Sequence, residues 1–255
     1  MSGDVKLILR DGKTLTLKKG IRVPEGSSLT IYGQSNDSGK LDARAGSYNA
    51  AIGSNDRDDD EEQGAGTIII HGGDVTAKGG SDSAGIGGGN EAHGGNITVY
   101  GGKVTSTAGT DAAGISSGDE YKGGSSGTVT IYGGVVNATG GDCGAGIGGG
   151  DDGNGGNVTI IDSKVIATAG KESGARAIGR GNGGKSNGSL TLSDNLMVCT
   201  GSAEKQGEEY IFETTGTVKA EARVDACQKN QMILIDLCDH VESEWRCEST
   251  AQHGK

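Results

Sequence analysis

The sequence repeats itself about every 30 residues, and this period constrains the fold more than any other feature. One copy reads NITVYGGKVTSTAG followed by AAGISSG, and related copies stand on both sides of it. One isoleucine of each copy recurs at intervals of 29 to 34 residues. These isoleucines are Ile52, Ile86, Ile115, Ile147 and Ile178. Such a period is typical of solenoids, in which each repeat packs only against its neighbours.

Each copy contains three short extended pieces. In the first, from Asn96 to Tyr100, period-2 alternation points Ile97 and Val99 to one face and Thr98 and Tyr100 to the other. Glycine-rich corners separate the pieces, and no stretch has helical spacing over ten residues. We therefore predict an all-β fold, a single-stranded, right-handed parallel β-helix (β-solenoid) of about six coils with three short strands each.

Coils stacked at about 4.8 Å would place equivalent residues above one another in columns. The inner columns are apolar, which explains how a chain with one Phe and one Trp buries a continuous core. Two of them begin at Leu29 and Ile31, a third contains Val75, Val104, Val136 and Val165, and the repeated isoleucines form the fourth.

The regular spacing of the glycines, present in one part of the chain and absent from others, divides the chain into three parts. We expect capping strands over residues 1–27, because the first coil of a solenoid must shield an open end. The repeats occupy residues 28–201. Over residues 202–255 the period is lost, and we expect a C-terminal cap with strands near 210–213 and 217–222, followed by the beginning of a Cys- and His-containing segment.

Charge excludes several classes of partner. A formal net charge of −11 disfavours nucleic acid and anionic membranes, because both require clusters of Lys and Arg. No apolar run approaches the ~18 residues of a membrane span. The first residues do not read as a signal peptide, so we expect targeting information to lie outside this sequence.

The blocks VPEGSSLTIYG, GNITVYGG, KVTSTAG and AGIGGG resemble the glycine-rich β-helical repeat regions of large cell-surface proteins of Gram-positive gut bacteria. The resemblance covers Val5 to about Gly201. Some modules of that kind are described as carbohydrate-binding. The resemblance implies an extracellular or cell-surface module within a larger multidomain chain. It carries no lyase or glycosidase motif.

The outward face of the first strand predicts a ligand-binding column. Aromatic rings recur there at coil spacing, where sugars could stack, and neighbouring threonines supply hydroxyl groups. The predicted residues are Tyr32, His71, Tyr100, Tyr132, Thr98 and Thr130. The alternative is that like residues stack in a solenoid for packing alone.

Two metal sites are candidates. Carboxylates gathered after the third strand suit Ca²⁺, namely Asp58, Asp60, Glu91, Asp119 and Asp151, unless they only keep the loops solvated. The tail offers sulfur and nitrogen ligands for Zn²⁺, namely Cys227, Cys238, His240 and Cys247, although a disulfide between two of these cysteines fits equally well. The tail also resembles C-x-H…C segments found after such repeat regions.

These observations favour a non-catalytic surface module that binds polysaccharide, host glycan or host protein. A structural spacer that projects another domain is the second interpretation. A polysaccharide lyase or hydrolase is the third, because Asp74, Lys103 and Lys164 fall on one outward column of the second strand.

Overall fold

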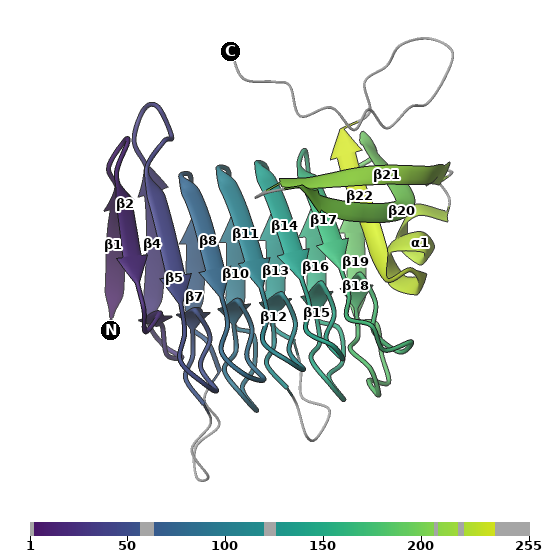
Figure 1. Ribbon diagram of the computed structural model, residues 1–255, viewed down its shortest axis with the longest axis horizontal. Helices are drawn as coiled ribbons and strands as arrows, with labels where there is room; N and C mark the ends of the chain where they lie inside the picture. Colours follow the sequence, from purple (N-terminus) through teal and green to yellow (C-terminus); the bar gives the residue numbers. More distant parts are fainter. Residues whose placement is uncertain (1–2, 57–63, 120–125, 207–208, 219–221, 238–255) are drawn as a thin grey trace.

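The computed structural model of the chain is a parallel β-solenoid of about six turns (Figure 1). It describes residues 3–56, 64–119, 126–206, 209–218 and 222–237. Each turn contributes one strand to each of three sheets, so the predicted fold class is confirmed.

The parallel strands of each sheet follow one another in chain order along the solenoid. The first sheet contains β1 (Asp4–Leu9), β4 (Ser28–Gly33), β7 (Thr67–Ile70), β10 (Asn96–Val99), β13 (Thr128–Ile131), β16 (Asn157–Ile160) and β19 (Ser189–Leu192). The second contains β2 (Thr14–Leu17), β5 (Lys40–Arg44), β8 (Asp74–Lys78), β11 (Lys103–Thr107), β14 (Val135–Thr139) and β17 (Lys164–Thr168). The third contains β3 (Ile21–Arg22), β6 (Ile52–Gly53), β9 (Ile86–Gly87), β12 (Ile115–Ser116), β15 (Ile147–Gly148) and β18 (Ile178–Gly179).

The strand register confirms the predicted inner columns. Val104 of β11 lies between Val75 of β8 and Val136 of β14, and all three side chains are fully buried. Ile115 of β12 lies in the same way between Ile86 and Ile147. These columns merge into one apolar core that runs the length of the solenoid. Residues about thirty apart in sequence are therefore direct neighbours in space.

The third sheet contains a column of residues with positive φ. It consists of Gly53 (151°), Gly87 (133°), Ser116 (112°), Gly148 (136°) and Gly179 (140°). Neighbouring backbones approach closely here, because a Cβ added at Gly148 would lie 2.0 Å from the carbonyl oxygen of Gly179. Ser116 is therefore the strained member of the column.

The C-terminal part extends the second sheet with antiparallel strands. β22 (Met232–Leu237) pairs with β17 and with β20 (Leu196–Gln206), and β20 pairs with β21 (Glu209–Val218). Helix α1 (Arg223–Lys229), where we expected no helix, packs against β18, β19 and β20. These elements cover the C-terminal end of the core (Figure 1). With seven residues, the only α-helix in the described part of the chain is too short to cross a membrane.

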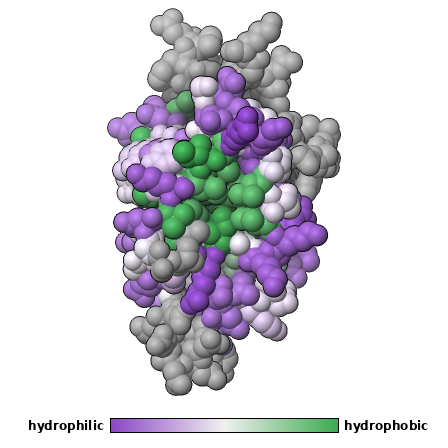
Figure 2. Space-filling model, turned by 90° about the vertical axis from the view of Figure 1, so that its left-hand side faces the viewer, coloured by the Kyte–Doolittle hydropathy of each residue, from purple (hydrophilic) through white to green (hydrophobic). Residues whose placement is uncertain are grey.

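The N-terminal end of the solenoid is built differently. β1, β2 and β3 stack in register on β4, β5 and β6 as a regular coil. Among the described residues, no strand pairs with their outer edges. Figure 2 views the molecule from this side and shows a hydrophobic centre within a hydrophilic rim.

Candidate functional site

The predicted aromatic column forms at the end of the first sheet. The rings lie at the end of the first strand of each coil, beside the corner: Tyr32 is the penultimate residue of β4, and His71, Tyr100 and Tyr132 directly follow β7, β10 and β13. The strand ladder continues through them, because the amides of His71, Tyr100 and Tyr132 donate to carbonyl oxygens one coil earlier at 2.7 to 2.8 Å. Successive ring centroids lie 4.8, 4.8 and 5.1 Å apart, with interplanar angles of 2°, 6° and 6°. The rings thus form one continuous stack.

This stack presents ring edges, not ring faces, to solvent. Each inner ring is covered on both faces by its neighbours, so no sugar ring can enter between them. Tyr100 and Tyr132 are nevertheless 49% and 44% exposed. At one end of the column Ile8 pairs with Tyr32 and is 64% exposed. The result is a ridge of aromatic edges and phenol hydroxyls.

The threonine column beside the rings is interrupted. Thr98 and Thr130 face each other on β10 and β13, and both are partly buried. On the preceding coil the equivalent residue is Ile69 of β7, which pairs with Thr98 and with Thr30. An isoleucine provides no hydroxyl, so the polar surface beside the rings is continuous only from Thr98 onward.

The acidic corner brings together carboxylates from successive coils. Four residues after each third-strand isoleucine lies a corner column of Asp56, Asn90, Asp119, Asp151 and Asn182. Four residues before the same isoleucines lies a second column, the turn column, which consists of Tyr48, Asp82, Asp111 and Cys143. The amides of Asn90, Asp119, Asp151 and Asn182 donate to the carbonyls of Tyr48, Asp82, Asp111 and Cys143 of the preceding coil, at 2.7 to 3.1 Å.

Amide side chains form hydrogen bonds with neighbouring carboxylates at two of the four steps of the corner column. Asn90 donates to the carboxylate of Asp56 at 3.1 Å, and Asn182 to that of Asp151 at 3.4 Å. Asp119 and Asp151 occupy adjacent coils with no such amide between them. Burial, followed by the charges of Asp151, Asp111, Asp82 and Asp152, raises the pKa of Asp119 to about 7. Burial also raises the pKa of Asp82 and Asp151.

The predicted calcium residues are only partly gathered at this corner. Asp119 and Asp151 lie together, whereas the exposed Glu91 stands one position beyond the corner column, and Asp58 and Asp60 lie outside the described residues. Within the described ranges, no group of three or more His, Cys, Asp or Glu is arranged to hold a metal ion. The sequence reasoning missed Asp82 and Asp111. They lie near Asp119 and Asp151 because backbone hydrogen bonds join the turn column to the corner column.

The cysteines take separate roles. Cys227 of α1 is free and fully buried in the core, and burial raises the pKa of its thiol to about 12. Cys238, His240 and Cys247 lie outside the described residues, so the zinc site stays a prediction. Cys199 of β20 is disulfide-bonded. Burial and a hydrogen bond with Asp111 raise the pKa of the free Cys143 to about 12, so its thiol is protonated at neutral pH.

The charged column of the second sheet is confirmed in position. Lys40, Asp74 and Lys103 occupy successive coils, and Lys164 lies two coils further on. Asp74 pairs with Lys40 at 3.3 Å, and Lys164 pairs with Asp236 at 2.7 Å. The only described carboxylate of the predicted enzymatic group is thus engaged in a surface ion pair.

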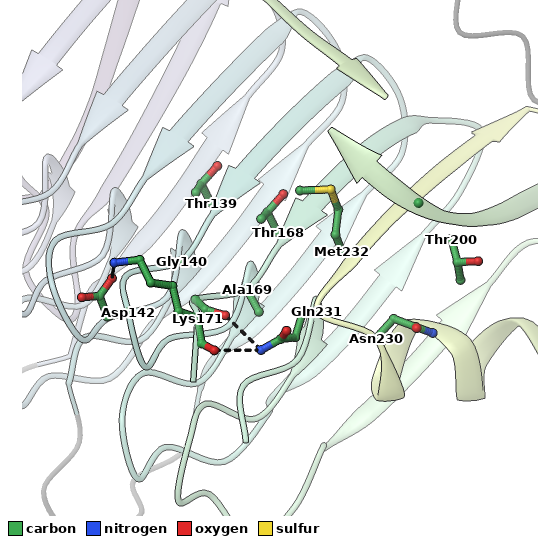
Figure 3. Close-up of a pocket in the computed structure, with 12 residues that line it drawn as sticks. Thr139, Gly140, Asp142, Thr168, Ala169, Lys171, Thr200, Asn230, Gln231 and Met232 are labelled. Carbon is green, nitrogen blue, oxygen red and sulfur yellow. Dashed lines mark hydrogen bonds and ion pairs between the residues drawn. The ribbon is translucent and has the colours of Figure 1, made fainter. Parts of the chain in front are cut away.

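A shallow polar depression of about 670 Å³ lies where the second sheet turns antiparallel (Figure 3). Thr139 and Thr168 line one side, and Met232 of β22 lies beside them. Lys171 and Asp142 form an ion pair of 3.0 Å at its edge, and Gln231 donates to the carbonyl of Glu172 at 2.9 Å. The sequence repeats do not predict this depression, because one of its sides is formed by β22, a strand outside the repeats that pairs with β17.

Comparisons with known proteins bear on the repeats. Residues 68–90, 97–119 and 129–151 match a family described as Beta helix repeat. Each match spans one coil, from the first strand to the corner after the third. No curated protein and no solved structure matches the chain. Together with the register, these matches establish that the chain contains a parallel β-helix repeat region.

Proposed function

We propose that this chain is a non-catalytic module of a cell-surface or secreted protein, and that it binds polysaccharide or glycan along the column of Tyr32, His71, Tyr100 and Tyr132. The observation that carries the proposal is the unbroken, solvent-exposed stack of rings at intervals of 4.8 to 5.1 Å. Aromatic side chains with a polar tip suit ligands that have both apolar and hydroxylated faces.

The spacing of the rings supports an extended ligand. One ring per coil gives a repeat close to that of one sugar unit along an extended 1,4-linked chain. A polysaccharide lying parallel to the solenoid axis would therefore meet a similar environment at each unit. A single sugar would gain only one such contact, so affinity depends on the length of the ligand.

The mode of contact follows from the exposed parts of the rings. Because the ring faces cover each other, the sugar packs against the ring edges by van der Waals contact, and its hydroxyls form hydrogen bonds with the phenol hydroxyls. Thr98 and Thr130 lie two residues before Tyr100 and Tyr132 on the same outward face and add further hydroxyls. We therefore place the centre of the site on β10 and β13.

A glycan array tests this proposal. Wild type should bind, and the Tyr100→Ala/Tyr132→Ala variant should lose at least about fivefold in affinity, if each ring contributes as much as an aromatic pair, about 0.5–1.5 kcal/mol. Tyr48→Ala is the control, because Tyr48 is equally exposed, at 46%, but lies in the turn column. Absence of binding, or equal binding by wild type and the double variant, would refute the proposal.

A structural spacer is the second candidate, and the mutual coverage of the ring faces favours it. Stacked rings stabilise adjacent coils by about 0.5–1.5 kcal/mol per pair without any ligand. On this alternative, the double variant melts at a lower temperature than wild type, and neither protein binds any glycan.

A further inference from the structure

The N-terminal end of the solenoid exposes side chains whose equivalents are buried in the next coil. Leu15 is 39% exposed, whereas Leu41, its equivalent one coil further, is 1% exposed. Val5 and Leu7 are also only partly buried, although their equivalents Leu29 and Ile31 are fully buried. The edges of β1, β2 and β3 add unpaired backbone groups around this apolar centre (Figure 2). Such an edge is a template for pairing with another chain.

We propose that this end is the interface of a symmetric dimer, in which two copies of the chain stack N-terminal end against N-terminal end. The other end cannot serve, because α1 and β22 cover it (Figure 1). A two-fold contact between identical ends also closes the assembly, since both sets of free edges are consumed.

The sequence of β1 is self-complementary in one antiparallel register. With the two-fold axis at Leu7, Leu7 faces Leu7 of the partner subunit and Val5 faces Leu9 of the partner subunit. On the outer face, Asp4 then lies opposite Arg10 of the partner subunit, twice by symmetry. A shift of one residue would set inward side chains against outward ones, and the alternative register centred on Lys6 would oppose two lysines.

Charge distinguishes a second copy from other partners. Residues 3–27 carry six Lys and Arg against three Asp and Glu, although the whole chain has a net charge of −11. Two such basic ends repel at long range, and salt screens this repulsion because the Debye length falls from about 10 Å at 0.1 M to about 3 Å at 1 M. Self-association should therefore strengthen with salt, whereas binding of an acidic partner should weaken.

Sedimentation equilibrium of the full chain over a range of protein and salt concentrations tests the proposal. We expect a reversible monomer–dimer equilibrium that shifts toward dimer as salt rises. Asp4→Arg and Arg10→Asp should each weaken the dimer about tenfold, because each reverses two cross-strand pairs. The double variant restores opposite charges and should dimerise like wild type.

Two controls keep the result independent of folding. Lys19→Asp reverses a charge in the corner of the same coil, outside the β1 register, and should leave the dimer intact. Leu15→Lys should give a folded monomer with the circular dichroism of wild type, because the Leu15 side chain is 39% exposed at the open end. A wild type that stays monomeric at the highest soluble concentration, dissociation by salt, or failure of the double variant to recover would each overturn the proposal.

Discussion

Ser116→Gly is expected to stabilise the protein. Ser116 holds a φ of 112° in a column whose other members are glycines. Its hydroxyl is buried and forms no hydrogen bond with any described residue. Positive φ at a residue with a Cβ costs about 1–3 kcal/mol, and an unpaired buried hydroxyl also costs about 1–3 kcal/mol.

The substitution removes both costs at the expense of chain entropy. Glycine loses about 0.5–1 kcal/mol more conformational freedom on folding than a residue with a Cβ. The net expectation is a gain of about 1–5 kcal/mol in the free energy of unfolding. Ser117→Gly is the matched control. The Ser117 hydroxyl accepts from the amide of Gly150 at 3.1 Å and contacts the carbonyl of Gly148 at 3.2 Å, so its loss should destabilise by about 1–2 kcal/mol.

Urea unfolding followed by circular dichroism measures both changes. Ser116→Gly should raise the midpoint and Ser117→Gly should lower it, with similar m-values for the three proteins. If Ser116→Gly were less stable than wild type, the assignment of strain and of an unpaired hydroxyl to Ser116 would be wrong.

Three other perturbations test the acidic corner and the third sheet. The pKa of Asp119 is raised to about 7, so the folded protein binds this proton more tightly than the unfolded chain does. Stability should therefore fall as pH rises from about 4 through 7, and Asp119→Asn should remove about 1 kcal/mol of this dependence after allowance for solvent screening. Gly148→Ala should destabilise the protein by about 3 kcal/mol or more, because the added Cβ would lie 2.0 Å from the carbonyl oxygen of Gly179. Urea unfolding measures this loss of stability. An unchanged stability would contradict the close approach of the Gly148 and Gly179 backbones. If carboxylates of the corner bind Ca²⁺, calcium should raise the melting temperature of wild type, and EDTA should reverse this rise. The Asp119→Asn/Asp151→Asn variant should not respond to calcium. Equal melting temperatures of wild type with and without calcium would refute a calcium site at the corner.

The coils and their inner columns could be predicted because their signals are local. Alternation places Ile97 and Val99 on one face, and the recurring glycines fix where each strand turns. The predicted handedness stays a prediction. The interruption of the threonine column at Ile69 is also visible in the sequence, in the segment TIII.

The parts that could not be predicted depend on contacts without a repeat. Alternation assigns Tyr100 to the outer face but does not fix its side-chain rotamer, so the sequence left open whether the rings stack on each other or present their faces to a ligand. β22 pairs with β17 although its sequence lacks the repeat pattern of β17. Helix α1 forms in a segment that has no helical spacing of apolar residues. The proximity of Asp82 to Asp119 arises from backbone hydrogen bonds between loops, which spacing alone does not indicate.

Titration calorimetry with oligosaccharides of increasing length tests the proposed function most directly. Once an array has identified the sugar, affinity should increase with each added unit until the ligand spans the four stacked rings, and then level off. The Tyr100→Ala/Tyr132→Ala variant should lose this dependence on length. Binding that is as tight for a single sugar as for a long chain, or no binding by any oligosaccharide, would contradict recognition along the column.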